Sequence, residues 1–143
     1  MLIRAWEQGD LDSINRIEQA SFSDPWSKKM LEDVMGMPRF LGFVIEEQGD
    51  VIGYIGASFV LDEGEILLVA VDETKRGNGY GKLLVSALIE ELSKQGVSVV
   101  FLEVRKSNSR AIACYEGCGF SKISERARYY GDGEDAIIME RKI

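Results

Sequence analysis

The sequence contains no histidine and only two cysteines, Cys114 and Cys118, which lie four residues apart. A cysteine-based metal site would have no obvious co-ligands here, and a cysteine nucleophile would have no imidazole to activate it. We therefore expect no bound metal and no acyl-cysteine intermediate. Two reduced thiols in a cytoplasmic protein are the simplest interpretation of this pair.

The chain also lacks a long apolar run and an excess of basic residues. No segment approaches the roughly 20 apolar residues of a membrane-spanning helix, and residues 1–10 lack the apolar core of a signal peptide. Lysine and arginine number 17 against 24 aspartates and glutamates, which gives a net charge of −7. A nucleic-acid partner would favour a basic surface, so we expect neither nucleic acid nor a membrane as a partner. The acidic balance is compatible with a cationic substrate.

With 143 residues the chain is long enough to build one core, and we expect a single domain over residues 1–143. Apolar runs typical of strands alternate with helical spacings in the order βααβββαβαββ. The strands are expected at residues 2–6, 40–46, 51–61, 65–71, 97–104, 121–127 and 135–141. Three helices are expected after the caps Asp10, Ser27 and Asn108 or Ser109, and another after residue 82. This order predicts an α+β fold, a three-layer α/β/α sandwich with a mixed central sheet and helices on both faces.

The most informative segment is glycine-rich and reads Arg76-Gly77-Asn78-Gly79-Tyr80-Gly81-Lys82. It follows the apolar strand and precedes an amphipathic helix, so its backbone N–H groups can converge on one point beside the positive end of the helix dipole. That arrangement predicts an anion site, most naturally for a phosphate or pyrophosphate. The spacing fits neither the Walker pattern, which needs Ser or Thr where Leu83 stands, nor the dinucleotide fingerprint, which needs Gly where Lys82 stands. From the glycines alone, a turn without any ligand is an equally good interpretation.

A second group of polar residues follows in the next strand and helix. Glu103 stands between Leu102 and Val104 in a strand that otherwise reads as core, where a partly desolvated carboxylate would suit a general base. The alternative is that Glu103 points to a solvated face or pairs with Arg105. Tyr115, in the helix that follows, lies one turn after Ala111 on the same helical face. The alternative to a role in the site is an aromatic core residue whose hydroxyl bonds a carbonyl.

These patterns resemble the GCN5-related N-acetyltransferase (GNAT) superfamily, whose pyrophosphate loop has the R-x-x-G-x-G spacing of Arg76, Gly79 and Gly81. Further segments resemble its RimI-like branch, the bacterial ribosomal-protein-alanine N-acetyltransferases. These segments are Pro25-Trp26-Ser27, Leu61-Asp62-Glu63, Ala70-Val71-Asp72, Leu102-Glu103-Val104-Arg105, Ser107-Asn108, Tyr115-Glu116, Gly119-Phe120, Tyr129-Tyr130 and Gly133-Glu134-Asp135-Ala136-Ile137-Ile138-Met139. One departure is Leu68, where the family usually has Asn next to the acetyl site. The departure bears on substrate choice more than on cofactor binding.

The resemblance implies acetyl-CoA as a cosubstrate, no metal, and direct transfer of the acetyl group to an amine. Val69, Ala70 and Val71 would line the acetyl and pantetheine arm with backbone groups, on a strand that splays away from the Glu103 strand. Asn108 would bond the coenzyme near its amide or sulfur end, Glu103 would be the base and Tyr115 the acid. The residues expected to wrap the pyrophosphate are Arg76, Gly77, Asn78, Gly79, Tyr80, Gly81 and Lys82.

The resemblance also implies a protein substrate, the N-terminal alanine of the eighteenth small-subunit ribosomal protein. Trp26, Tyr129 and Tyr130 would pack on the peptide, while Glu134 and Asp135 would meet a cationic second residue. The alternative for these two acids is a solvated turn. Two other functions stay open. One is an acetyltransferase of the same fold for small amines or lysine side chains, and the other is a non-catalytic acyl-CoA-binding module.

Overall fold

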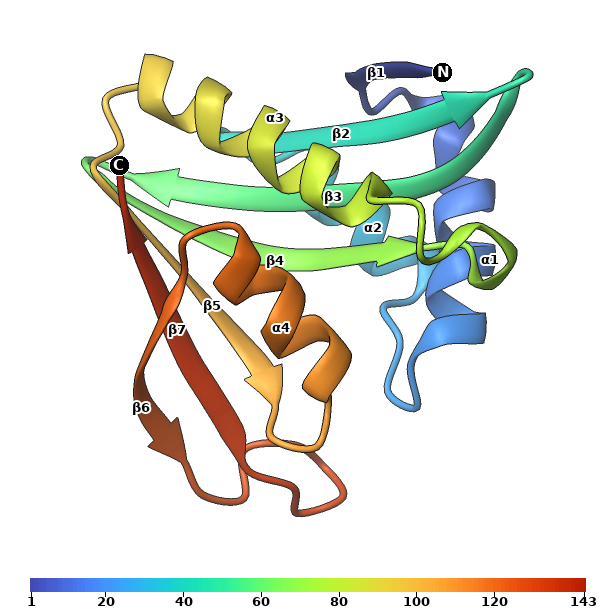
Figure 1. Cartoon of the computed structure of the whole chain (residues 1–143). Helices are drawn as coiled ribbons and strands as arrows, with labels where there is room; N and C mark the ends of the chain where they lie inside the picture. The colour runs from blue at the N-terminus through green and yellow to red at the C-terminus, as the bar shows by residue number, and fades with distance from the viewer.

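The computed structural model describes all 143 residues, and its elements follow the predicted order (Figure 1). The strands are β1 (Leu2–Ala5), β2 (Phe40–Glu47), β3 (Asp50–Val60), β4 (Glu63–Val71), β5 (Val99–Arg105), β6 (Ser121–Arg126) and β7 (Ala136–Lys142). The helices are α1 (Leu11–Ser21), α2 (Lys28–Met35), α3 (Tyr80–Lys94) and α4 (Ser109–Gly117), with short 3-10 helices η1 (Gln8–Asp10) and η2 (Glu73–Lys75). None of these helices combines the length and the apolar character needed to cross a bilayer.

All seven strands form one sheet in the order β1-β2-β3-β4-β5-β7-β6. The central β4–β5 pair is parallel and the other pairs are antiparallel, so the sheet is mixed, as predicted. In Figure 1, α3 and α4 lie in front of the sheet, whereas α1 and α2 lie behind it. The predicted three-layer arrangement with helices on both faces is therefore confirmed. The turn predicted at residues 62–64 is confined to residues 61–62, so β4 begins two residues early.

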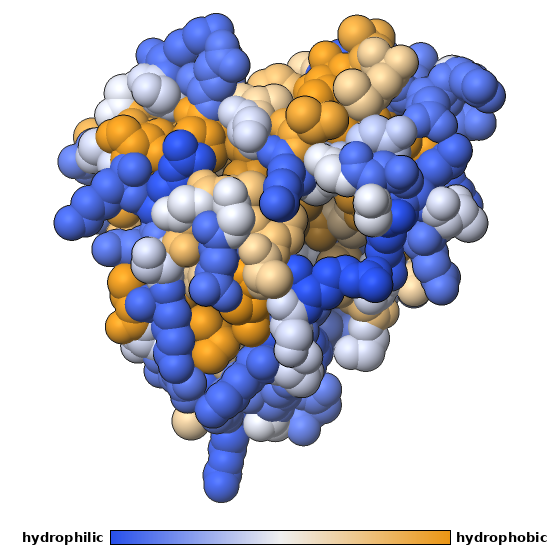
Figure 2. Space-filling model, viewed as in Figure 1, coloured by the Kyte–Doolittle hydropathy of each residue, from blue (hydrophilic) through white to orange (hydrophobic).

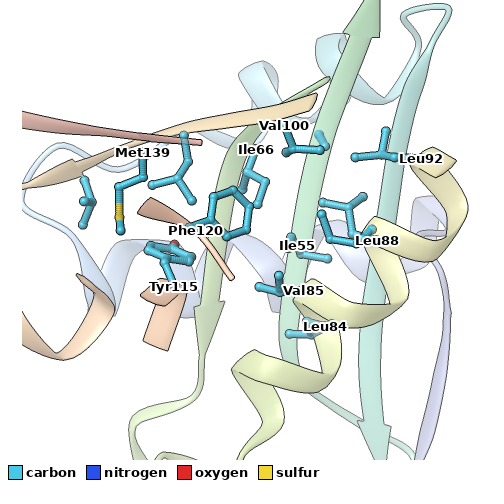
Figure 3. Packing of buried hydrophobic residues seen from close by; sticks show 14 of the residues in the cluster. Ile55, Ile66, Leu84, Val85, Leu88, Leu92, Val100, Tyr115, Phe120 and Met139 are labelled. Carbon is cyan, nitrogen blue, oxygen red and sulfur yellow. The ribbon is translucent and has the colours of Figure 1, made fainter. Parts of the chain in front are cut away.

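Two hydrophobic clusters hold the helices against the two faces of the sheet. In the larger cluster, Leu84, Leu88 and Leu92 recur at helical spacing along α3 and point toward the strands (Figure 3). In the smaller cluster, Leu11 and Ile14 of α1 pack behind the sheet. The helical spacings in the sequence therefore mark buried helix faces. Behind the sheet, α1 and α2 pack mainly on β2, β3 and β4, while β5 and β6 keep partly exposed side chains there.

Side-chain capping agrees with the prediction at two helices and differs at a third. Ser27 Oγ and Asn108 Oδ1 each accept the backbone N–H three residues further on, at 3.2 Å and 3.1 Å. The predicted cap Asp10 does not cap α1. Its carboxylate accepts the N–H of Glu7 and the guanidinium of Arg4 instead, both at 2.8 Å. This prediction is wrong because a 3-10 turn precedes the helix and uses the same carboxylate.

One carboxylate is buried between α1 and the sheet. Glu18 is 2% exposed, and its Oε1 accepts the hydroxyl of Tyr54, which is fully buried in β3. Its Oε2 accepts the backbone N–H of Trp26 at 3.0 Å. Burial raises the pKa of Glu18 above its usual value, although both hydrogen bonds act in the opposite direction. Glu18 therefore anchors the loop between α1 and α2 to the core.

Glu18→Gln should remove a pH dependence from the stability of the fold. The folded-state pKa of Glu18 lies above the ordinary value of 4.5, so the native state binds this proton more tightly than the unfolded chain does. Its contribution to the unfolding free energy is fully present at a pH below 4.5 and is lost as the pH rises through the folded-state pKa. Urea denaturation at a series of pH values should show that, as the pH rises, the unfolding free energy of the wild type falls relative to that of Glu18→Gln.

A matched control for this prediction is Glu116→Gln, at an exposed position of α4. Its unfolding free energy should follow that of the wild type across the series. A constant difference between the wild type and Glu18→Gln from about pH 4 to about pH 8 would contradict the assignment.

Candidate active site

The parallel strands β4 and β5 separate after the first three residues of each. Their last paired residues are Glu65 and Phe101. Beyond this point β4 stays paired with β3 as far as Val71, and β5 stays paired with β7 as far as Arg105. The strands therefore diverge toward their carboxyl ends, where open α/β sheets bind ligands, and each keeps one edge without a partner strand. The predicted splay of the strand at residues 69–71 is confirmed.

A β-bulge lies in β4 where the split begins. Gly56 of β3 stands opposite Leu68 and Ala57 stands opposite Ile66, so Leu67 has no partner across this pair. The extra residue reverses the alternation of side chains along β4. Ile66 packs in the cluster beneath α3, whereas Leu68 packs in the cluster with α1 and α2. Leu68, the departure from the family pattern, is therefore a buried residue of the rear layer.

The glycine-rich loop joins the end of β4 to the start of α3. Gly77 and Gly79 have positive φ angles of 83° and 80°, a conformation that favours glycine. A Cβ on either residue would meet no atom within 4 Å, so the space beside the loop is open. Gly79 is the N-cap of α3 and no side chain caps this helix. The first N–H groups of α3 thus lack side-chain partners, which fits the predicted anion site.

The polar side chains of the loop bond to the protein scaffold. Arg76 donates from Nε to the carbonyl at the end of β4 at 3.1 Å, and from Nη2 to Ser21 Oγ at 3.2 Å. Asn78 donates to a carbonyl within the loop at 2.9 Å, and the hydroxyl of Tyr80 donates to Glu47 at 2.6 Å. These bonds fix the shape of the loop. Its backbone, more than these side chains, faces the open space.

The first turn of α3 also approaches α4. A Cβ on Gly81 would lie 3.7 Å from Cys114 Sγ, which is ordinary contact. The Nζ of Lys82 lies 3.1 Å from the position of a Cβ on Gly117, so the Lys82 side chain extends to the far end of α4. A Cβ at position 117 would require the end of the Lys82 side chain to shift by a few tenths of an ångström.

Asn108 and Tyr115 come from α4 on the same side of the sheet. Asn108 uses Oδ1 as the helix cap, which leaves its Nδ2 group as a donor. Tyr115 is 9% exposed and packs edge-to-face on Phe120, with ring centroids 6.0 Å apart (Figure 3). Burial raises the pKa of Tyr115 well above its usual value. Its ring is a core residue, as the alternative proposed, while its hydroxyl stays protonated and able to donate.

Glu103 lies on the opposite face of the sheet from Tyr115. Strand alternation buries its two neighbours in the cluster beneath α4 and leaves the Glu103 side chain 25% exposed. The side chain is therefore partly buried, as expected, but not by these two neighbours, which lie on the other face of the sheet. Glu103 does not pair with Arg105 either. Its Oε2 accepts the hydroxyl of Tyr129 at 2.5 Å, and its Oε1 lies 3.5 Å from Arg126 Nη1. The bond to Glu103 raises the pKa of Tyr129 to about 12.

Arg105 ties together the two loops that were expected to form a peptide wall. Its Nη1 donates to Asp132 at 2.8 Å and to Glu134 at 3.0 Å in the β6–β7 loop. Its Nη2 donates to Asp24 at 3.1 Å in the α1–α2 loop. The guanidinium carbon lies 4.2 Å from the centroid of the Tyr130 ring. The structure thus brings the predicted segments at 25–26 and 129–135 to one place.

Three residues predicted to contact the peptide are engaged inside the chain. Glu134 binds Arg105 and also accepts the N–H of Ser107 at 2.9 Å. Asp135 accepts the N–H of Arg128 at 3.0 Å. Trp26 is half-buried against the rear cluster. We correct the prediction for Glu134, because Arg105 and the N–H of Ser107 already occupy its two oxygens, whereas only Oδ1 of Asp135 has a partner in the chain.

Sequence reasoning missed Glu18 and the bonds made by Arg105 and Arg126. For Glu18 a signal existed, since it lies seven residues after Leu11 and four after Ile14, on the apolar face of α1. The two arginines carried no such signal. Their hydrogen-bond partners are 23 to 82 residues away along the chain, and only the fold brings them close.

The predicted site residues therefore lie on two sides of one split. The glycine-rich loop, Asn108 and Tyr115 lie on the side of α3 and α4, and the space-filling view of this side is hollowed right of its centre (Figure 2). Glu103 and Tyr129 lie on the rear side. Tyr130 lies close to both groups. Its hydroxyl helps to raise the pKa of Tyr115, and the charge of Glu103 helps to raise the pKa of Tyr130. Two reactants could meet here from opposite faces of the sheet.

Comparisons with known proteins agree with this geometry. A family model described as the acetyltransferase (GNAT) family matches residues 11–120. The chain is 41% identical over 140 residues to the ribosomal protein bS18-alanine N-acetyltransferase of Escherichia coli (strain K12), covering 96% of this chain and 94% of that protein. It is 37% identical over 142 residues to the protein of the same name from Haemophilus influenzae, with 96% of each covered. The crystal structure of the ribosomal-protein-S18-alanine N-acetyltransferase from Escherichia coli matches with a TM-score of 0.91 and 39% identity, covering 99% of this chain and 93% of that one.

Gly79→Val should abolish binding of acetyl-CoA at the loop. A β-branched residue is strained at a φ of 80° and would place its side chain between the backbone and the pyrophosphate. Gly96→Val is the matched control, since Gly96 has a φ of 88° and open space around its Cβ position. It follows α3 at the opposite end, about 22 Å from the loop. Calorimetry should show affinity lost in Gly79→Val and retained in Gly96→Val. Equal affinities in the two variants would remove the loop as the pyrophosphate site.

Proposed function

The chain belongs to the acetyltransferase (GNAT) family, and on that premise we propose that it transfers the acetyl group of acetyl-CoA to the N-terminal alanine of ribosomal protein bS18. The observation that carries the proposal is its similarity, over nearly the full length, to enzymes named for this reaction. Residues 1–143 act as a single N-acetyltransferase domain. This substrate places the enzyme in the cytoplasm, where ribosomal proteins are made.

Acetyl-CoA binds on the side of α3 and α4. The backbone N–H groups of residues 76–82 and the start of α3 hold the pyrophosphate, which the open space at Gly77 and Gly79 supports. Val69, Ala70 and Val71 present the edge of β4 that has no partner strand to the pantetheine arm. Asn108 donates from Nδ2 near the amide or sulfur end.

The acceptor amine enters from the rear side, next to Glu103. An α-amine has a pKa of about 8, so about a tenth of it is neutral at pH 7 and a modest base is sufficient. Glu103 takes the proton, directly or through a water, as the amine nitrogen bonds to the thioester carbonyl carbon. The hydroxyl of Tyr129 holds the carboxylate in place. A backbone N–H of the β4 strand near the bulge stabilises the carbonyl oxygen as its negative charge develops.

Tyr115 stabilises the coenzyme sulfur as the carbon–sulfur bond breaks. A thiol has a pKa of about 8.5 and an ordinary tyrosine about 10, so full proton transfer is uphill by roughly 2 kcal/mol even without burial. Burial raises the pKa of Tyr115 further and makes complete transfer still less favourable. Tyr115 therefore acts by sharing its proton in a hydrogen bond to the departing sulfur.

The first residue of the peptide lies beside the two loops that Arg105 connects. The rings of Tyr129 and Tyr130 stand perpendicular, with centroids 5.1 Å apart, and Tyr129 is 43% exposed. These rings and Trp26 border the position of that first residue. The hydrogen bond from the Trp26 backbone to Glu18 keeps this border fixed.

An alanine-started peptide of the bS18 sequence should be a far better substrate than the same peptide with a blocked N-terminus and an internal lysine. The pKa values of about 8 and about 10.4 make the neutral form roughly 250-fold more abundant for the α-amine than for lysine at pH 7. Mass spectrometry of the products, with release of free coenzyme A as the rate, measures the difference. Equal turnover of the blocked lysine peptide or of spermidine would support an acetyltransferase with broad amine specificity instead.

Glu103→Gln and Tyr115→Phe should each lower kcat by about 10²- to 10⁴-fold while acetyl-CoA affinity is retained. The loss in Glu103→Gln should be largest at low pH, where fewer substrate amines are already neutral. Tyr115→Phe keeps the packed ring and removes only the donor. Glu116→Gln, on the exposed face of α4, is the control for Glu103→Gln. Near wild-type rates in both active-site variants would show that these residues are structural only.

A further inference from the structure

A groove of about 450 Å³ lies on the rear face of the sheet, next to Glu103. Strands β3, β4, β5, β6 and β7 all contribute to it. Residues that line it include Val60, Glu63, Glu65, Phe101, Arg126 and Ile138, together with Glu103 itself. The groove is therefore continuous with the rear side of the candidate active site.

The sheet register alternates acidic and apolar side chains along this groove. Glu65 stands opposite Phe101 across β4–β5, and Glu103 stands opposite Ile138 across β5–β7. Residues opposite each other in neighbouring strands point to the same face. A phenyl ring and an isoleucine thus lie beside two carboxylates. Such a surface fits the aliphatic stem and charged head of a lysine or arginine.

The negative charge of the groove is not balanced within the chain. Neither Glu63 nor Glu65 forms an ion pair, whereas Arg126, the one basic residue of the lining, is directed to Glu103. Burial, together with the charge of Glu103, raises the pKa of Glu65. By contrast, Glu134 in the adjacent loop is already bonded to Arg105. A cationic side chain in the groove would relieve the repulsion between Glu65 and Glu103.

The distance along the groove fits a peptide that begins at the acetylation site. Measured along β5, the distance from Glu103 to Phe101, which stands opposite Glu65, is about 7 Å. The distance from Glu103 to Val99, which stands opposite Glu63, is about 13 Å. An extended peptide advances about 3.4 Å per residue. A chain whose first amine lies at Glu103 would therefore bring its third to fifth residues to Glu65 and Glu63.

We propose that this groove binds a lysine or arginine at the third to fifth position of the acceptor polypeptide, with its head at Glu65 and its stem on Phe101 and Ile138. The inference rests on the proposed function, because it takes the acetylated amine to lie at Glu103. It goes beyond that function by assigning specificity to a basic residue downstream of the N-terminus. Glu65 and Glu63, which form no ion pair, therefore take the role of binding a basic peptide residue that the sequence predicted for Glu134 and Asp135.

The test uses six-residue peptides that begin with alanine and carry one arginine at positions two to five in turn, or norleucine in its place. For the wild type, KM should be about threefold to fivefold lower with arginine at one of positions three to five, with kcat unchanged. Glu65→Gln should erase this preference at that position and leave the norleucine peptide unaffected. Glu65→Lys should reverse it in favour of a glutamate peptide. Glu116→Gln is the control and should keep the wild-type preference.

Direct binding of the same peptides, followed by fluorescence anisotropy, gives a second readout that does not require turnover. Stronger binding of the arginine peptide to the wild type than to Glu65→Gln supports the groove even if no alanine peptide is acetylated, an outcome that would overturn only the proposed function. If the peptides are acetylated but Glu65→Gln changes arginine and norleucine peptides equally, the groove assignment is overturned and the proposed function stands. Thermal unfolding of each variant establishes that it is folded.

Discussion

The short parallel contact between β4 and β5 is the constraint on which the site depends. The two strands pair only from Glu63 to Glu65, and each is then held along its other edge, β4 by β3 and β5 by β7. Antiparallel partners on both sides keep the strands in place while they diverge. Backbone groups that would otherwise pair with each other are left facing a gap in the middle of the sheet. A ligand can satisfy them there without disturbing the fold.

The split also explains why the active site needs residues from both faces of the sheet. Tyr115 comes from α4 in front, and Glu103 points behind, because the strand that carries it alternates. A transfer between two substrates suits this arrangement, since each can approach from its own side. On the rear side Arg105 holds the loops of residues 22–27 and 127–135 together, and Glu18 fixes the first of these loops to the core. The wall beside the acceptor amine is therefore built from charges that neutralise one another.

Two kinds of carboxylate lie on the rear face: those bonded within the chain shape the loops, and those without an ion pair line the groove. The sequence predicted that Glu134 and Asp135 are available to a substrate, yet both oxygens of Glu134 and one oxygen of Asp135 are bonded by Arg105 or by backbone N–H groups. Nothing in the sequence indicated a binding role for Glu65, because it begins an apolar run. In the structure it lies in a groove next to Glu103 and forms no ion pair. The positions of acidic residues in the sequence therefore do not show which of them are available to a substrate. An acid is available only where the fold places no partner beside it.

The sequence by itself determined the order of the elements, the buried faces of the helices, the cap at Ser27 and the glycine-rich loop, and it narrowed the cap of α4 to Asn108 or Ser109. These features depend on periodicity and on backbone conformation, which act between residues a few positions apart. Only the tertiary structure decided the bulge at Leu67, the face on which Glu103 lies and the partners of Arg105. A nearly continuous apolar run concealed the alternation of β5, and the hydrogen bonds of Arg105 span 27 to 82 residues. Such choices follow from which strands become neighbours, and that is settled by the packing of the whole chain.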